Sequence, residues 1–437
     1  MDTFDPALFL NSLAVFGSRL GLERMQCLAE SMNHPELRYP VIHLAGTNGK
    51  GSVAAMLTAV LSAAGLKVGC YTSPHLISYN ERICINGCPI AEDDFARILQ
   101  QVSIHIPSCQ ETAGHPTQFE VLTMAAFEYF AQQTVDIAVV ETGLGGIHDS
   151  TNIVMPVLSI ITGISIDHIV YLGRDIVSIA EKKAGIVKTN IPVVAGEMPP
   201  EAFAVIKAKC VLTNSQLSIG DADEYSLQVA EQSLVQQRIV CGPGVFAGME
   251  LRMKMLGDYQ KGNLAVALAS VERLRQQGYD ISDTTLKIGL ERAFWPGRMH
   301  VISQNPLIIA DGAHNADGAV KFVQSCKTLL NGKHTAIVFS CLQDKDIESI
   351  IKSFSELGDL LIAVGLETDR GLTAVQLRER VHNIGIDCEI AVDLQSAVER
   401  AAADDYEAVC ICGSLYLVGK AIEIWHDGGG AKNVCKA

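Results

Sequence analysis

The chain has 437 residues, of which 48% are hydrophobic, and its formal net charge is −15. A chain of this length and composition buries more than one core, so we expect a globular protein of two domains. The negative charge without a basic block argues against nucleic acid as a partner, and no apolar run is long enough to cross a bilayer, so we expect a cytoplasmic protein with no membrane partner.

The 13 cysteines are odd in number, scattered and without a C-x-x-C pair. Most lie in apolar, strand-like runs, which is typical of small buried side chains in a reducing compartment. A zinc site built on Cys84 and Cys88, the most closely spaced pair along with Cys410 and Cys412, is an alternative.

Residues 1–40 predict helices, and residues 41–45 predict a buried strand followed by a glycine-rich loop that opens a helix. In a turn of this kind, backbone N–H groups and the helix N-terminus bind phosphate, while a lysine and a hydroxyl meet phosphate oxygens and Mg²⁺. The spacing departs from the common phosphate-loop pattern, and such turns also occur for packing alone. The loop comprises Gly46, Thr47, Asn48, Gly49, Lys50, Gly51 and Ser52.

Polar residues follow two further strands. Residues 67–71 lead into Ser73 within a Ser-Pro-His turn, which also fits a simple turn. Residues 135–140 end at Glu141, a carboxylate at the tip of a strand, where a Mg²⁺ ligand is expected beside a phosphate loop. Clustered glycines and short polar residues follow over 143–152 and suit close backbone approach to a ligand.

A strand at 157–162 leads to His168, and a helix then carries Lys182 and Lys183. On the residues alone, His168 fits a base or a core histidine and Lys183 a solvated charge. Residues 186–250 indicate strands and loops with no identifiable chemistry. A helix is expected over 264–277.

The pattern breaks at Trp295-Pro-Gly-Arg298, and strands and helices then alternate to the C-terminus. We therefore expect an α/β protein of two doubly wound domains, a phosphate-loop domain over residues 1–296 and a smaller Rossmann-like domain over residues 297–437.

Several motifs together resemble the folylpolyglutamate synthase and dihydrofolate synthase family, a branch of the Mur-type ATP-dependent amide ligases. Besides the phosphate loop they are Ser73-Pro-His-Leu, Asn80-Glu-Arg-Ile, Glu141-Thr-Gly-Leu-Gly-Gly, Asp149-Ser-Thr-Asn, Asp167-His, Lys183-Ala-Gly, Gly297-Arg, Asp311-Gly-Ala-His-Asn and Lys345-Asp. The resemblance implies that ATP phosphorylates a substrate carboxylate and that L-glutamate attacks the acyl phosphate, giving an amide, ADP and phosphate.

The resemblance also implies residue roles. Lys50, Lys183 and His314 would be catalytic, and the nucleotide would be bound by the phosphate loop with Asn263, Arg298, Asp311 and His314. One Mg²⁺ would be held by Ser52, Ser73, Glu141 and His168, and a second by Lys183 as a carbamate. The pteroate or folate acceptor would be bound by Arg82, Thr117, Phe119, Asp149 and Ser150, with Phe119 stacking on the pterin and the Asp149 carboxylate accepting its N–H groups.

Two departures from the family pattern, Ile147-His148 and Lys182, leave the acceptor open between dihydropteroate and folates. We expect Lys182 to lower the pKa of Lys183 by like-charge repulsion and so favour a carbamate. The expected assembly is a monomer.

Two rival interpretations are a Mur-type ligase for another carboxylate and a phosphate-loop switch that regulates a partner. A ligase for UDP precursors would be expected to carry an extra N-terminal domain, whereas about 40 residues precede the loop here. A switch leaves the second domain without a purpose.

Overall fold

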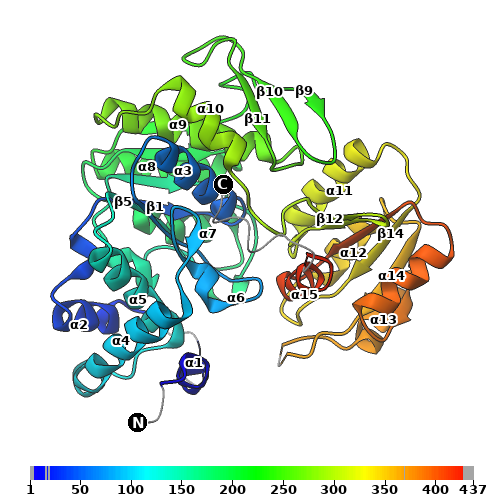
Figure 1. The fold of residues 1–437 in the computed structure, drawn as a ribbon, viewed down its shortest axis with the longest axis horizontal. Helices are drawn as coiled ribbons and strands as arrows, with labels where there is room; N and C mark the ends of the chain where they lie inside the picture. Colours follow the sequence, from blue (N-terminus) through cyan, green and yellow to red (C-terminus); the bar gives the residue numbers. More distant parts are fainter. Residues whose placement is uncertain (1–3, 15–16, 18–19, 369, 427–437) are drawn as a thin grey trace. The chain divides into compact units, whose positions relative to one another are not determined.

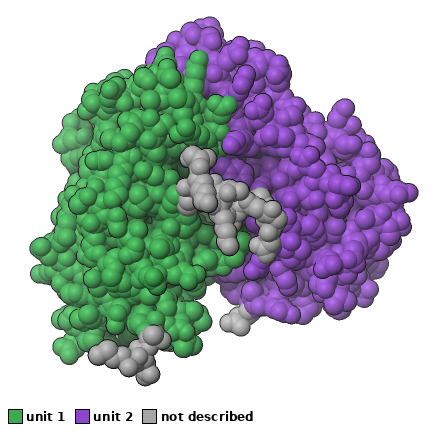
Figure 2. Space-filling view, in the orientation of Figure 1, with its two compact units in different colours: residues 1–227, 262–293 green, residues 228–261, 294–437 purple. Residues whose placement is uncertain are grey.

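The computed structural model describes residues 4–14, 17, 20–368 and 370–426, which fall into two compact units (Figure 1, Figure 2). One unit comprises residues 1–227 and 262–293, and the other comprises residues 228–261 and 294–437. This division differs from the single expected boundary after residue 296, because residues 228–261 group with the C-terminal part. Leu256 belongs to the C-terminal hydrophobic core, and Leu234 and Tyr259 pack against it.

The first unit is built on an eight-stranded sheet of order β4-β3-β2-β5-β1-β6-β7-β8. Six strands, from β2 to β8 in that order, are parallel, and β3 and β4 extend the edge as antiparallel strands. The strands are β1 Val41–Ala45, β2 Val68–Tyr71, β3 Ile83–Ile85, β4 Cys88–Pro89, β5 Ile137–Glu141, β6 Leu158–Ile161, β7 Val193–Gly196 and β8 Leu217–Gly220. Parallel strands buried on both faces read as continuous apolar runs, which is why the sequence indicated β1, β2, β5 and β6 clearly.

Helices cover both faces of this sheet (Figure 1). They are α1 Pro6–Ala14, α2 Glu23–Ser31, α3 Lys50–Ala63, α4 Glu92–Thr112, α5 Gln118–Gln132, α6 Ile169–Leu172, α7 Ile176–Lys183, α8 Pro200–Leu212, α9 Gln260–Gln276 and α10 Asp283–Arg292. Helix α8 corrects the expectation of strands and loops alone over 186–250. Its apolar residues show almost no helical periodicity, so the pattern that indicates an amphipathic helix is missing.

The alternation of strand side chains assigns the residues of β1 to two faces. Val41 belongs to the core formed with α2, α4 and α5, and Ala45 belongs to the core formed with α7 and α8. By this alternation, Val41, His43 and Ala45 point to the same face of the sheet, so His43 lies between these two cores. On α10, a Cβ at Gly289 would lie 2.4 Å from Val60 Cα of α3, so a glycine is needed for these helices to pack this closely.

The second unit contains a three-stranded antiparallel sheet and a six-stranded sheet of order β12-β13-β17-β14-β15-β16, which is parallel except for β12. The strands are β9 Gln228–Gln232, β10 Gln237–Val240, β11 Glu250–Met253, β12 His300–Gln304, β13 Leu307–Ala310, β14 Thr335–Phe339, β15 Leu360–Val364, β16 Glu389–Ala391 and β17 Ala408–Cys412. The helices are α11 Ala316–Leu330, α12 Ile347–Phe354, α13 Ala374–Asn383, α14 Leu394–Ala403 and α15 Leu415–His426. The expected doubly wound arrangement of this region is confirmed.

Candidate active site

The carboxyl ends of four neighbouring parallel strands meet at one edge of the first sheet. Leu44 pairs with Glu141, Ala45 pairs with Ile161, and Tyr71 pairs with Val140. The segments that follow these strands therefore emerge together, and they carry the phosphate loop, Ser73, Glu141 and His168. This edge is where an open α/β sheet binds its ligands.

The phosphate loop is fixed to the segment after β6. Thr47 N donates to Gly163 O at 2.8 Å, and Thr47 Oγ1 donates to Ser165 O at 3.1 Å. Thr162 Oγ1 donates to Asn48 O at 2.7 Å. These bonds hold the loop in one conformation from the β6 side before any ligand binds.

Two glycines of the loop have positive φ values and no room for a side chain. A Cβ at Gly46, where φ is +154°, would lie 2.0 Å from Thr162 Oγ1. A Cβ at Gly49, where φ is +89°, would lie 2.3 Å from Asn263 Oδ1, which places this expected nucleotide residue directly against the loop. Helix α3 begins at the next residue, Lys50, so its N-terminal N–H groups open onto the same loop.

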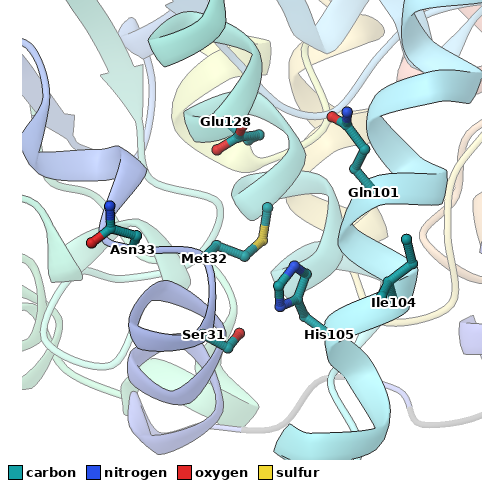
Figure 3. Close-up of a pocket in the computed structure, with 7 residues that line it drawn as sticks. All are labelled: Ser31, Met32, Asn33, Gln101, Ile104, His105 and Glu128. Atoms are coloured by element: carbon teal, nitrogen blue, oxygen red, sulfur yellow. The ribbon is translucent and has the colours of Figure 1, made fainter.

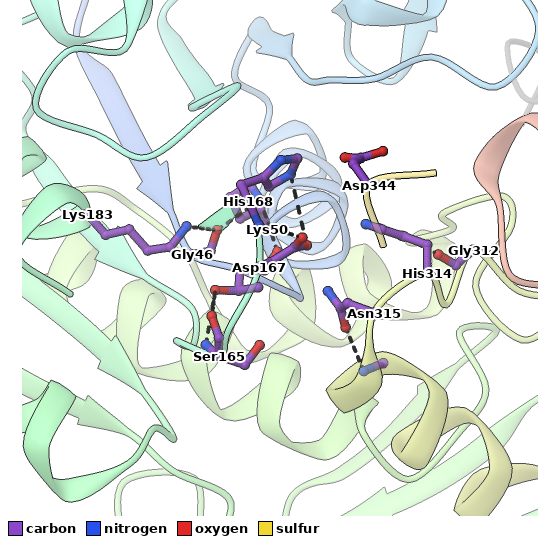
Figure 4. A network of polar contacts seen from close by, with 12 residues as sticks. Gly46, Lys50, Ser165, Asp167, His168, Lys183, Gly312, His314, Asn315 and Asp344 are labelled. Atoms are coloured by element: carbon purple, nitrogen blue, oxygen red, sulfur yellow. Dashed lines mark hydrogen bonds and ion pairs between the residues drawn. The ribbon is translucent and has the colours of Figure 1, made fainter. Parts of the chain in front are cut away.

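Two lysine amines converge on one backbone carbonyl (Figure 4). Lys183 Nζ donates to Gly46 O at 2.7 Å, across 137 positions of sequence, and Lys50 Nζ donates to the same oxygen at 3.0 Å. The Lys183 side chain is buried, and burial together with the charge of Lys50 lowers its pKa from 10.5 to about 7. The carboxylates of Asp167, Asp149 and Glu141 oppose this shift in the pKa.

The expected role of Lys182 is therefore wrong. The cation that lowers the pKa of Lys183 is Lys50, a member of the loop, and the larger cause is burial. Lys182 directly precedes Lys183 in α7, and adjacent residues of a helix point in different directions, so Lys183 is buried while Lys182 is half-buried.

Oxygen donors suited to a hard cation lie beside Lys50. Glu141 Oε1 lies 3.6 Å from Lys50 Nζ, and Glu141 Oε2 accepts a bond from Ser73 N at 3.3 Å. Ser52 is buried in the first turn of α3. His168 Nε2 lies 3.9 Å from Asp167 Oδ2, with the side chain 40% exposed. Carboxylate and hydroxyl oxygens are ligands that Mg²⁺ prefers, so the chemistry of Ser52, Ser73 and Glu141 fits this ion.

The residues expected to bind the acceptor lie on three segments of the first unit. Thr117 caps α5, with its Oγ1 accepting from Glu120 N, and the ring of Phe119 packs 6.1 Å from that of Tyr71. Asp149 is buried and accepts bonds from Leu144 N at 2.7 Å and Thr151 N at 3.0 Å.

Ser150, also expected at the acceptor, follows Asp149 and is buried. Arg82 Nε donates to His75 Nδ1 at 2.9 Å, which joins the segment after β2 to the start of β3. Burial raises the pKa of Asp149, and hydrogen bonds from Leu144, Thr151 and Gly143 oppose that rise.

In the second unit, a strand-to-helix turn after β13 carries the remaining predicted residues. Asp311 is buried and accepts three bonds of 2.8 Å, from Tyr259 Oη, Met299 N and Ala313 N. Burial raises the pKa of this carboxyl, against the opposing charge of Arg298. His314 Nδ1 lies 2.7 Å from Gly312 O, and because a carbonyl only accepts, Nδ1 carries the proton.

Arg298 packs tightly against this turn. A Cβ at Gly312 would lie 2.1 Å from Arg298 Nη1, so a side chain there would displace the guanidinium. Arg298 Nη1 donates to Gly297 O at 2.9 Å. The turn therefore gathers Arg298, Asp311 and His314 within one unit.

Sequence reasoning missed Thr162 and Tyr259. Thr162 directly follows the last residue of β6, as Ser73 and Glu141 stand at the carboxyl ends of β2 and β5, so the rule that found those two residues could have found it. Nothing in the sequence indicates that the Tyr259 hydroxyl reaches Asp311, because 52 positions separate them.

The described residues contain no group of three or more His, Cys, Asp or Glu side chains arranged to hold a metal, which leaves the zinc alternative at Cys84 and Cys88 without further ligands of these types.

A hollow of about 350 Å³ lies between α2, α4 and α5 (Figure 3). It is lined by Ser31, Met32, Asn33, Gln101, Ile104, His105 and Glu128, none of which is a predicted site residue. Within the described part of the chain, no helix combines the length and apolarity needed to cross a membrane.

The chain matches the Mur ligase middle domain over residues 44–271 and the Mur ligase, glutamate ligase domain, over residues 297–415. It is 35% identical over 424 residues to the dihydrofolate synthase/folylpolyglutamate synthase of Bacillus subtilis, which covers 95% of this chain and 97% of that protein. It is 37% identical over 326 residues to the folylpolyglutamate synthase of Lacticaseibacillus casei, covering 74% and 76%. The structure of Mycobacterium tuberculosis folylpolyglutamate synthase complexed with ADP is similar, with a TM-score of 0.87, 30% identity, and coverage of 97% of this chain and 99% of that one.

Proposed function

This chain belongs to the dihydrofolate synthase/folylpolyglutamate synthase family of Mur ligases and is an ATP-dependent ligase, and from that premise we propose that it joins L-glutamate to the carboxylate of dihydropteroate, of a folate or of both. The observation that carries the proposal is the pair of amines, Lys50 and Lys183, converging on Gly46 O inside the phosphate loop. The pair divides its roles: Lys50 can meet phosphate as a cation, whereas Lys183, whose pKa burial and Lys50 lower to about 7, is partly neutral and free to react.

The proposed reaction has two steps. An oxygen of the acceptor carboxylate attacks the γ-phosphorus of ATP, the bond to the β-γ bridging oxygen breaks, and ADP leaves. The neutral amino group of glutamate then attacks the acyl carbon, the C–O bond to phosphate breaks, and the nitrogen loses a proton as the amide forms. Carboxylate and γ-phosphate repel each other, so the first step needs cations placed beforehand.

Lys50 would neutralise phosphate charge, because its amine already lies within the loop that the N-terminus of α3 faces. Ser52, Ser73 and Glu141 would hold Mg²⁺, which when bound neutralises further charge on the β- and γ-phosphates. We include His168 in this set on the family resemblance.

Lys183 would serve the same site as a carbamate. Addition of CO₂ to its neutral amine forms an N–C bond, releases one proton and leaves an anionic oxygen ligand. The reaction requires an unprotonated amine, and a pKa of about 7 supplies a substantial fraction of it at neutral pH. A lysine with an ordinary pKa would supply almost none.

The acceptor would contact Thr117 and Phe119 at the start of α5 and Asp149 and Ser150 after β5. These residues belong to the same unit as the phosphate loop. An aromatic ring and a buried carboxylate suit a flat, N–H-bearing ring system. We include Arg298, Asp311 and His314 among the nucleotide residues on the family resemblance.

Release of phosphate from ATP by the purified protein tests this function directly. We expect release that requires Mg²⁺, L-glutamate and either dihydropteroate or tetrahydrofolate together, with one amide formed per phosphate. Phosphate release without any acceptor would favour a nucleotide switch instead. Phosphate release that requires a different carboxylic acid, and neither dihydropteroate nor tetrahydrofolate, would favour a Mur-type ligase for another substrate.

A further inference from the structure

A buried hydrogen-bonded chain connects β1 to the loop that follows β5. His43 of β1 is fully buried, and its Nε2 lies 2.8 Å from Thr151 Oγ1. Thr151 Oγ1 in turn donates to Asp149 Oδ1 at 2.5 Å. The reaction proposed above assigns no role to His43 or Thr151, yet burying such groups is costly unless they are well paired.

The direction of the chain follows from its last member. The Asp149 carboxylate is an acceptor, since it also receives bonds from Thr151 N and Leu144 N. The Thr151 hydroxyl therefore gives its proton to Asp149 and must accept from His43, so the proton of the imidazole lies on Nε2. His43 Nδ1 has no hydrogen-bond partner among the described residues, which agrees with this tautomer.

His43 stays neutral in this position. Burial, with a smaller contribution from the Lys188 charge, lowers its pKa to about 3. A neutral imidazole with one fixed N–H donates the same hydrogen bond across the working pH range. The hydrogen-bonded chain therefore keeps its geometry and does not change its protonation with pH.

The neighbour of His43 on β6 shows what a purely structural polar residue looks like here. Ser159 pairs with His43 in the sheet register, is equally buried, and donates to Ile186 O at 3.0 Å. Its bond ends on a backbone carbonyl and not on the side chain of a predicted site residue. The bond from His43 ends, through Thr151, on a residue expected to contact the acceptor.

We propose that His43 is a positioning residue for the acceptor: through Thr151 it fixes the Asp149 carboxylate relative to the strand that feeds the phosphate loop. This rests on the proposed function, because Asp149 belongs to the acceptor site assigned there. The strand β1 ends at Ala45 and the loop begins at Gly46, so the chain ties the acceptor-binding loop to the element that places ATP.

Steady-state kinetics with His43→Leu and Thr151→Val test the proposal. His43→Leu removes the bond between His43 and Thr151, and Thr151→Val removes both bonds of the Thr151 hydroxyl while keeping the shape of Thr. One of the two variants remains informative if the other fails to fold. We expect the KM for dihydropteroate or tetrahydrofolate to rise about tenfold in each, with the KM for ATP within about twofold of the wild type. The double variant should be no worse than the singles, because both break one chain.

Two matched controls separate positioning from stability. His43→Gln places an amide N–H near the position of Nε2 and should restore most of the acceptor KM. Ser159→Ala, at the paired position of β6, should lower the melting temperature without changing the acceptor KM. Imidazole ¹⁵N NMR of the wild type should show the proton of His43 on Nε2.

Two results would overturn this inference alone, provided that the wild type is active. One is an equal change in the KM for the acceptor and the KM for ATP. The other is an unchanged acceptor KM in folded His43→Leu and Thr151→Val. A proton on Nδ1 would overturn the direction of the chain and the inference with it. Absence of acceptor-dependent turnover in the wild type would overturn the proposed function together with this inference.

Discussion

The turn after β1 in the first unit and the turn after β13 in the second both connect a buried parallel strand to a helix, but they treat charge in opposite ways. After β1, two lysine amines share the single acceptor Gly46 O. After β13, one carboxylate, Asp311, receives three hydrogen bonds. The first turn brings two basic groups together and so lowers the pKa of one of them, whereas the second satisfies a negative charge internally.

This difference indicates what each turn is for. Two amines on one carbonyl oppose each other's protonation, and such an arrangement is useful when one must be a cation for phosphate and the other a neutral amine that can react. A carboxylate with all its bonds made within the protein stabilises its own turn and so places Arg298 and His314. Substitution of Lys50 should therefore reduce activity more than stability, whereas substitution of Asp311 should also reduce stability.

The largest effect is expected for Lys50→Ala. Loss of this cation should lower kcat about a thousandfold, while the melting temperature stays within a few degrees, because Lys50 is not part of a hydrophobic core. Lys67→Ala is the control: Lys67 stands before the amino end of β2 and donates to Gln133 O. Full turnover in Lys50→Ala would remove the phosphate loop from the account.

Glu141→Gln should lower kcat about a hundredfold, since a neutral amide is a poorer partner for a hard cation than a carboxylate. Titration of kcat with Mg²⁺ provides the measurement, and Glu128→Gln on α5 provides the control. If excess Mg²⁺ restored the full rate, Glu141 would affect only the affinity for the metal.

Asp311→Asn tests the opposite turn. An amide can replace only one of the two oxygens, so one buried donor is left facing an NH₂ group, which should reduce the free energy of unfolding by about 2 kcal/mol. Asp317→Asn, whose ion pair with Lys321 lies within α11, should cost less than about 0.5 kcal/mol. Unchanged stability in Asp311→Asn together with lost activity would make Asp311 a binding residue instead.

The last prediction concerns the pH dependence of stability. The pKa of Lys183 is about 7 in the folded protein and 10.5 for an ordinary lysine, so between these values the unfolded chain binds more protons. The unfolding free energy of the wild type should therefore rise with pH in this window, relative to Lys183→Met, by up to about 1.4 kcal/mol per pH unit.

Denaturant titrations of both proteins without nucleotide or bicarbonate measure this slope, with Lys182→Met as the control that keeps Lys183. Parallel pH profiles for the wild type and Lys183→Met would show that Lys183 is charged and solvated at neutral pH, against the burial described above.

The sequence predicted the phosphate loop and the residues at strand ends because their chemistry is local. Lys50 and Ser52 lie within a few positions of the strand that presents them, and parallel strands bring Ser73 and Glu141 to the same edge. Strands β14, β15 and β17 of the second unit were equally clear, since their apolar runs are continuous.

What the sequence could not predict depends on contacts between distant segments. The effect of Lys50 on Lys183 and the chain from His43 to Asp149 each require residues more than 100 positions apart to meet. The adjacent Lys182 was the only candidate that sequence spacing offered, and it was the wrong one. Helix α8 was missed because its apolar residues do not follow a helical period.

Transfer of ¹⁸O from the acceptor to phosphate tests the central claim most directly. With dihydropteroate or tetrahydrofolate labelled in both carboxylate oxygens, attack on the γ-phosphorus carries one labelled oxygen into the acyl phosphate, and attack by glutamate then releases it on phosphate. The account predicts one ¹⁸O per phosphate released, with the other retained in the amide carbonyl. Unlabelled phosphate formed during turnover would contradict activation of the acceptor carboxylate by ATP.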